Sequence, residues 1–95
     1  MNVGIVGCGF ISGIHVNAWR DIGLHVTSVC DLNEKAAIQF TKKWKIPAYY
    51  TQFSEMLDNE DLFAVSVCVP PQFHANVVID ALESGCNIVV EKPFT

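Results

Sequence analysis

Residues 2–13 read NVGIVGCGFISG, and this stretch decides the fold. Residues 2–6 form a short, mostly apolar run that stops at a glycine, as is typical of a strand buried on both faces. Gly7 permits a tight turn, and Gly9 lets the backbone approach a pyrophosphate at the positive end of a following helix. The pattern is GxGxxS, with Gly13 one residue later than the strict motif requires. A plain strand-to-helix turn would fit the same residues.

The rest of the chain alternates between helices and strands. The predicted strands are 2–6, 25–30, 48–51, 62–69 and 87–90, and the predicted helices are 11–22, 34–45, 55–57 and 72–84. Such alternation with short connections predicts an α/β fold with a doubly wound parallel sheet, a Rossmann fold of about five strands. In that fold, ligands bind outside the carboxyl ends of the strands.

Local signals place the helix ends. Gly23 and Gly85 follow helices where a left-handed cap is expected, and Asn33 and Ser54 can cap the helices that they precede. The first helix is expected to pack onto the first strand, because apolar residues recur along it at helical spacing. These residues are Ile11, Ile14, Ala18, Trp19 and Ile22.

Composition excludes several classes of protein. The chain has 95 residues, 51% of them hydrophobic and 17% charged, which excludes disorder and fits one small domain. A formal charge of −4 and the lack of a basic stripe argue against nucleic acid as a ligand. No apolar run approaches the roughly 20 residues of a membrane span, and the first residues do not read as a secretory signal, so a cytoplasmic location is expected.

The four cysteines give no metal motif. Successive cysteines are 22, 38 and 18 residues apart, so no CxxC pair is present. Cys8, Cys30 and Cys68 end three neighbouring predicted strands and could lie close together. We nevertheless predict no metal site and interpret the cysteines as reduced thiols.

Asp31 is a second signal, beside the glycine loop, for a site that binds a dinucleotide. It lies 22 residues after Gly9, at the end of the second predicted strand, where a carboxylate can accept both hydroxyls of an adenosine ribose. The carboxylate would also repel a 2′-phosphate, and no arginine follows it, so NAD is favoured over NADP. A solvated loop aspartate remains an alternative, as does a site for the adenosine of S-adenosylmethionine in a methyltransferase.

Several motifs together resemble one family. The glycine loop with His15 behind it, Asp31, Pro70 followed by His74, and the terminal tripeptide 91–93 resemble the amino-terminal NAD(P)-binding domain of the glucose–fructose oxidoreductase/inositol dehydrogenase (Gfo/Idh/MocA) family. The resemblance covers residues 1–95. The tripeptide Glu-Lys-Pro, which follows ALESGCNIVV, is its most specific part, whereas many Rossmann proteins share the glycine loop.

The resemblance implies an oxidoreductase that transfers hydride between NAD(P) and a hydroxyl-bearing carbon of a sugar, a cyclitol or a similar small molecule. Residues 1–95 would be its cofactor domain, truncated before a second domain that holds the substrate and builds a homo-oligomer. Lys92 would be the catalytic residue, polarising the reacting hydroxyl. The general acid or base is expected in the absent domain, so this piece alone would be inactive. The implied cofactor-binding residues are Gly7, Gly9, Phe10, Ile11, Asp31, Val69, Pro70, His74, Glu91, Lys92 and Pro93.

Other interpretations stay open at this point. The chain could be a non-catalytic NAD-binding sensor, in which case Lys92 would be only an exposed lysine. His74 fits a helix cap as well as a cofactor contact, and His15 is expected to pack or hydrogen-bond along its helix. A fifth strand without a neighbour would be a bare edge, so self-association or marginal stability is expected.

Overall fold

The chain forms an α/β fold with a parallel β-sheet, as predicted. The computed structural model describes residues 1–68, 79, 83 and 85–90. Within these residues the strands are β1 (Asn2–Val6), β2 (His25–Cys30), β3 (Ala48–Tyr50), β4 (Ala64–Val67) and β5 (Asn87–Val90). The helices are α1 (Phe10–Asp21), α2 (Glu34–Trp44) and α3 (Phe53–Asn59). Ile79 and Glu83 are helical, and the remainder of the predicted helix 72–84 lies outside the described residues.

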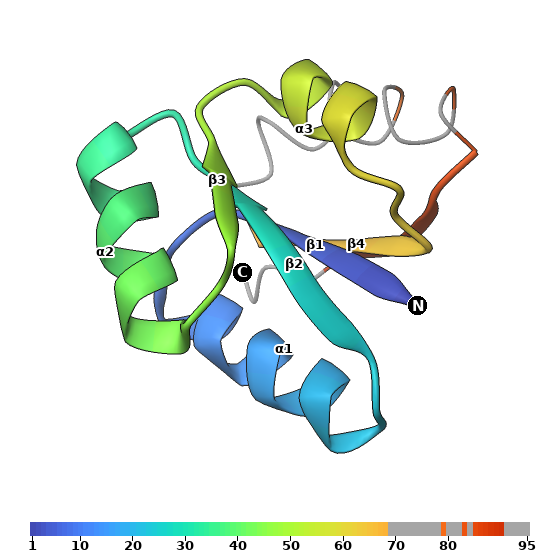
Figure 1. Cartoon of the computed structure of the whole chain (residues 1–95), viewed down its shortest axis with the longest axis horizontal. Coiled ribbons are helices and arrows are strands. Elements are labelled where there is room, and N and C mark those ends of the chain that lie inside the picture. Colours follow the sequence, from blue (N-terminus) through green and yellow to red (C-terminus); the bar gives the residue numbers. More distant parts are fainter. Residues whose placement is uncertain (69–78, 80–82, 84, 91–95) are drawn as a thin grey trace, which may run out of the picture.

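The sheet order is β3-β2-β1-β4-β5, and every pairing is parallel. The strand order therefore reverses at β1, which lies between β2 and β4. Helices α1 and α2 cover one face of the sheet, and α3 lies on the other face (Figure 1). This is the doubly wound arrangement, in which the carboxyl ends of β1, β2 and β4 meet at one edge.

Each face of the sheet has its own apolar cluster. On the α1 and α2 face, the buried residues are Ile5, Val16, Val26, Val29, Phe40 and Ile46. On the α3 face, they are Val6, Cys30, Met56, Val65, Val67 and Cys86. Strands β1 and β2 contribute to both clusters, so apolar residues follow one another directly at their carboxyl ends instead of alternating with polar ones.

The packing face of α1 differs from the prediction. The helix itself is confirmed, and Gly23 follows it with φ 85° as expected. Its buried residues, however, are Ser12, Gly13 and Val16, whereas the isoleucines and the alanine that indicated the helix are exposed. Small residues allow α1 to approach its neighbours closely, and a larger side chain would hold it away. Periodicity located the helix but not its inner face.

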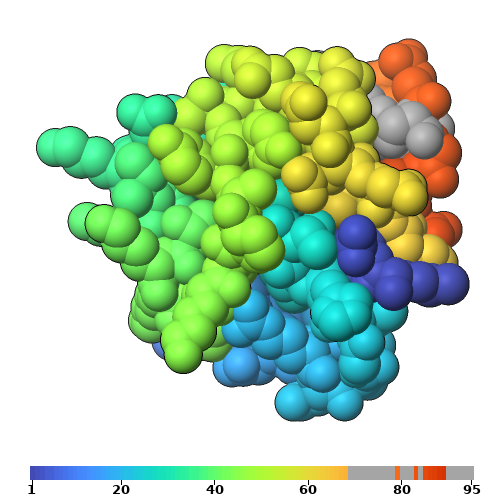
Figure 2. Space-filling view, in the orientation of Figure 1, coloured from blue at the N-terminus to red at the C-terminus, as the bar shows by residue number. Residues whose placement is uncertain are grey.

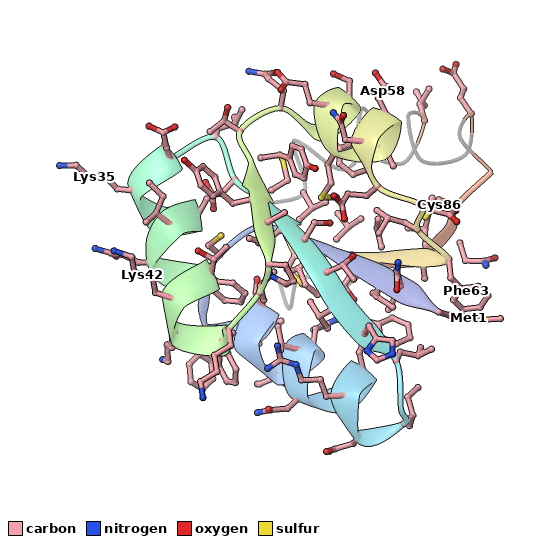
Figure 3. The ribbon with its side chains drawn as sticks, in the orientation of Figure 1. Met1, Lys35, Lys42, Asp58, Phe63 and Cys86 are labelled. Atoms are coloured by element: carbon pink, nitrogen blue, oxygen red, sulfur yellow. The ribbon has the colours of Figure 1, made fainter. Side chains whose placement is uncertain are left out.

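The ends of α2 are capped largely as predicted. The Asn33 side-chain oxygen accepts a hydrogen bond from the Ala36 amide at 3.2 Å. Lys42 lies in the last turn of α2, where a cation complements the helix dipole, and its side chain points outward (Figure 3).

The prediction that Ser54 caps the next helix is wrong, since α3 begins at Phe53 after Gln52. Ser54 therefore lies within the first turn and does not cap it.

The amino terminus lies at the far end of the sheet from the carboxyl ends. The Phe63 amide donates to the Asn2 carbonyl at 2.8 Å, and the His25 amide donates to the Met1 carbonyl at 3.0 Å. Met1 and Phe63 are neighbours at this end of the molecule (Figure 3). On the surface, the dark blue amino-terminal segment lies beside the yellow segment that precedes β4 (Figure 2). The edge at which ligands bind in such folds is therefore the opposite one.

Gly13 is a point of close contact between α1 and α2. A Cβ atom added to Gly13 would lie 2.5 Å from Cζ2 of Trp44. We expect Gly13→Ala to lower the free energy of unfolding by about 1–3 kcal/mol, the usual cost of overpacking. Urea unfolding followed by circular dichroism measures this change. Trp44→Leu in the same chain should recover part of the loss, and purely additive effects in the double variant would contradict the contact.

Two ionisable side chains, at the carboxyl ends of β2 and β3, predict that the free energy of unfolding depends on pH. Burial raises the pKa of the Cys30 thiol from 9.0 to about 12, and the nearby Asp31 and Glu55 carboxylates add to the shift. The Tyr50 hydroxyl donates to the Glu60 carboxylate at 2.7 Å, and this bond is the main cause that raises its pKa from 10.0 to about 12. Both groups therefore keep their protons longer in the folded chain than in the unfolded one.

The contribution of these two groups to the free energy of unfolding should accordingly be constant below about pH 9 and fall as the pH rises from 9 towards 12. The unfolded chain loses these protons first, so alkali favours unfolding, with a limiting slope of about 1.4 kcal/mol per pH unit for Cys30 and a smaller one for Tyr50, which solvent screens. Urea titrations in the presence of a reductant measure the slope. Cys30→Ala should flatten it, and Val29→Ala, which removes no ionisable group, should not. An equal slope in Cys30→Ala and the unaltered chain would contradict this account.

Candidate functional site

The glycine loop leaves the positive end of α1 open. Gly7 has φ 100°, a conformation that favours glycine, and its amide donates to the Cys30 carbonyl at 2.7 Å. Gly9 is the residue that precedes α1; it is exposed, and a Cβ added to it would meet nothing within 4 Å. The N-cap residue Gly9 makes no side-chain cap, and the first turn of α1 contains no acidic residue. Backbone amides at this helix end can therefore hold an anion.

Asp31 joins the loop after β2 to the glycine loop. Its Oδ2 accepts a hydrogen bond from the Cys8 amide at 3.0 Å, and its Oδ1 accepts one from the Asn33 amide at 2.8 Å. The side chain is half-buried, so the interpretation as a merely solvated aspartate is not supported. Each carboxylate oxygen retains acceptor capacity for a further donor. The carboxylate therefore lies next to the open end of α1 and can accept hydroxyl donors there.

The thiol inside the glycine loop stays protonated. Burial and, to a smaller extent, the Asp31 carboxylate together raise the pKa of Cys8 to about 12, because a thiolate there would lose solvation and be repelled by the carboxylate. A neutral thiol is neither a strong nucleophile nor a good metal ligand. Among the described residues, no group of three or more histidine, cysteine, aspartate or glutamate side chains is placed to hold a metal ion.

The structure brings together only part of the predicted site. Gly7, Gly9 and Asp31 meet at the carboxyl ends of β1 and β2, as predicted. Phe10 begins α1 with a side chain that is 85% exposed, and Ile11 follows it, also exposed. The other predicted site residues lie outside the described part of the chain. These are Val69, Pro70, His74, Glu91, Lys92 and Pro93.

A groove between α1 and α2 was not predicted. It has a volume of about 570 Å³ and opens beside the glycine loop, between residues such as Phe10 and Ile14 of α1 and Phe40 and Trp44 of α2. Lys43 lies at this groove, with its Nζ 5.6 Å from the centre of the Trp44 ring. Exposed apolar residues on α1 were the available signal, but they were interpreted as core.

Several known proteins with similar sequences are named as dehydrogenases. The chain is 31% identical over 91 residues to D-apiose dehydrogenase of Paraburkholderia graminis, which covers 95% of this chain and 24% of that protein. It is 29% identical over 97 residues to inositol 2-dehydrogenase of Corynebacterium glutamicum, covering 100% of this chain and 29% of the relative. The chain thus spans about a quarter of the length of these relatives.

A solved structure shows the same fold. Scyllo-inositol dehydrogenase of Lactobacillus casei, crystallised with NAD(H) and scyllo-inositol, matches with a TM-score of 0.87 and 23% sequence identity. The match covers 98% of this chain and 28% of that one. At this level of identity the likeness establishes the Rossmann fold.

A family model identifies the chain as a whole. The model of the Gfo/Idh/MocA group, described as an oxidoreductase family with an NAD-binding Rossmann fold, matches residues 1–95. The glycine loop, the open end of α1 and the carboxylate of Asp31 are the features that such a domain uses for a dinucleotide. The chain belongs to the Gfo/Idh/MocA oxidoreductase family, of which it is an NAD-binding Rossmann domain.

Proposed function

We propose that the chain binds NAD(H) in preference to NADP(H), as the cofactor domain of an enzyme that oxidises or reduces a hydroxyl-bearing carbon of a sugar or cyclitol. The observation that carries the proposal is the Asp31 carboxylate, held by the Cys8 amide beside the uncapped end of α1. Relatives named as apiose and inositol dehydrogenases support the substrate class.

The described residues fit the two halves of an adenosine diphosphate group. The amides at the start of α1, with Gly9 leaving open space above them, would bind the pyrophosphate. Asp31 would accept the ribose hydroxyls. A 2′-phosphate would face Asp31 and the nearby Glu34, while the first basic residue after them, Lys35, points outward from α2 (Figure 3).

The nicotinamide supplies the hydride chemistry when the cofactor is bound, and the protein supplies position and charge. In our proposal Lys92 polarises the reacting oxygen, and Glu91, Pro93, Val69, Pro70 and His74 border the cofactor. Support for these roles is the resemblance of the motifs 69–74 and 91–93 to the family pattern.

The parent protein is proposed to contain a second domain that holds the substrate and to form a homo-oligomer. Relatives three to four times as long as this chain support the former. The position of β5 at the end of the sheet order, with Val89 40% exposed, supports an interaction at that edge.

We also propose a cytoplasmic location, which the free thiols of Cys8, Cys30 and Cys86 support. Among the described residues, no helix combines the length and apolar character needed to span a membrane.

Calorimetric titration with NAD, NADP and S-adenosylmethionine tests the cofactor directly. We expect NAD to bind at least about tenfold more tightly than NADP, since the phosphate meets the carboxylate of Asp31 without a basic partner. Asp31→Ala should lower the affinity for NAD and remove the preference for NAD over NADP. Asp58→Ala, which removes an exposed aspartate on α3, is the matched control and should change neither affinity.

The outcomes separate the alternatives. Binding of S-adenosylmethionine alone would favour a methyltransferase, and equal affinity for NAD and NADP would contradict the role of Asp31. Binding of NAD with no turnover of sugars or cyclitols by the full-length protein would favour a non-catalytic sensor.

The role proposed for Lys92 concerns the chemical step. In the full-length protein, Lys92→Met should lower kcat by about 10²–10³, the usual effect of removing one polarising group, while NAD affinity changes little. Steady-state kinetics and calorimetry measure the two quantities. Lys35→Met removes a solvent-facing lysine and should leave both unchanged; a similar kcat in both variants would exclude Lys92 from the reaction.

A further inference from the structure

A buried hydroxyl connects α1 to the sheet. Ser66 lies in the middle of β4, fully buried, and its Oγ faces α1. The Trp19 Nε1 donates to this oxygen at 2.7 Å, and the His15 Nδ1 lies 2.9 Å from it. One atom of the sheet therefore contacts two side chains that are four residues apart on the same face of the helix.

The chemistry of the three groups fixes the direction of one of the two bonds. An indole nitrogen only donates, so the oxygen of Ser66 accepts from Trp19. The bond between Ser66 and Nδ1 of His15 can run in either direction, because the hydroxyl oxygen keeps a second lone pair as well as its own proton, and the direction follows the tautomer of His15.

The bonds to Ser66 restrain α1, whose small buried side chains do little to restrain it by packing alone. The buried face of α1 consists mainly of small side chains at Ser12, Gly13 and Val16, which offer few protrusions that would resist sliding or rotation. Two directional bonds to a single oxygen resist both. The start of α1, at Phe10, lies five residues before His15, or about 7.5 Å along the helix axis.

We propose that Ser66 is a positioning residue: through Trp19 and His15 it holds α1 in place on β4, and so fixes the amides of the glycine loop. Its effect on cofactor affinity rests on the proposed function, because the loop is the proposed pyrophosphate site. Its effects on the tautomer of His15 and on the position of the loop amides do not depend on the proposed function.

Ser66→Ala is the direct test, and Ser28→Ala is the matched control. Ser28 is also a fully buried strand serine, but its hydroxyl has no hydrogen-bond partner among the described residues. Trp19→Phe removes only the donor while keeping a ring, and it serves if Ser66→Ala fails to fold. The imidazole nitrogens of His15, the amide resonances of Gly7, Cys8 and Gly9, and the dissociation constant for NAD are measured in each folded variant by nitrogen-15 NMR and calorimetry.

In the unaltered chain we expect one tautomer of His15 to predominate, because its Nδ1 is bonded to the Ser66 hydroxyl. Ser66→Ala should change the tautomer populations, shift the loop amides and weaken NAD binding by about tenfold, the order of one lost hydrogen bond. Ser28→Ala should change none of these. Unchanged tautomer populations in Ser66→Ala, or loop amides unmoved in both Ser66→Ala and Trp19→Phe, would overturn the proposal. Failure of the unaltered chain to bind NAD would count against the proposed function, while the NMR readouts would still decide the role of Ser66.

Discussion

The close approach of α1 to its neighbours is the constraint on which the candidate site depends. Ser12 is buried and Gly13 leaves no room for a Cβ beside the Trp44 ring, so the helix lies against both the sheet and α2. This position presents the start of α1 at the carboxyl ends of β1 and β2. It also explains the GxGxxS pattern, because the late glycine serves the contact with α2 while the serine takes the small buried position. The departure from the strict motif thus reflects which neighbour each residue faces.

The Asp31 carboxylate connects this arrangement to binding. It accepts hydrogen bonds from the amides of Cys8 and Asn33, so it orders two loops that belong to different strands before any ligand arrives. Preorganised acceptors cost less to bring together when a ligand binds. Burial, with the same carboxylate adding to it, keeps the Cys8 thiol neutral, with its pKa at about 12, so that the loop presents amides rather than a negative sulfur to an anion. One side chain therefore orders the loop, helps to keep its thiol neutral and retains acceptor capacity beside the start of α1.

Much of the fold could be predicted from local pattern. The bounds of β1, β2 and β5 agree with the prediction, because each is an apolar run limited by a glycine, a charged residue or a turn. Asn33 was identified correctly as a cap, since its hydrogen bond joins residues three apart. The inner face of α1 was predicted wrongly. Hydrophobic periodicity favours large apolar residues for a core face, whereas this interface requires small ones, and Ile14 is left 51% exposed.

The sequence by itself determined the α/β alternation, the glycine loop and the placing of Asp31 at the end of a strand. These features are local, and parallel strands carry their carboxyl ends to a common edge without further information. Tertiary structure decided which side of α1 is buried, the groove between α1 and α2, and the contact of Ser66 with Trp19 and His15. Those contacts join residues 47 and 51 positions apart in the chain, and a serine within an apolar strand does not indicate its partner. Only the packing of helix on sheet brings these three side chains together.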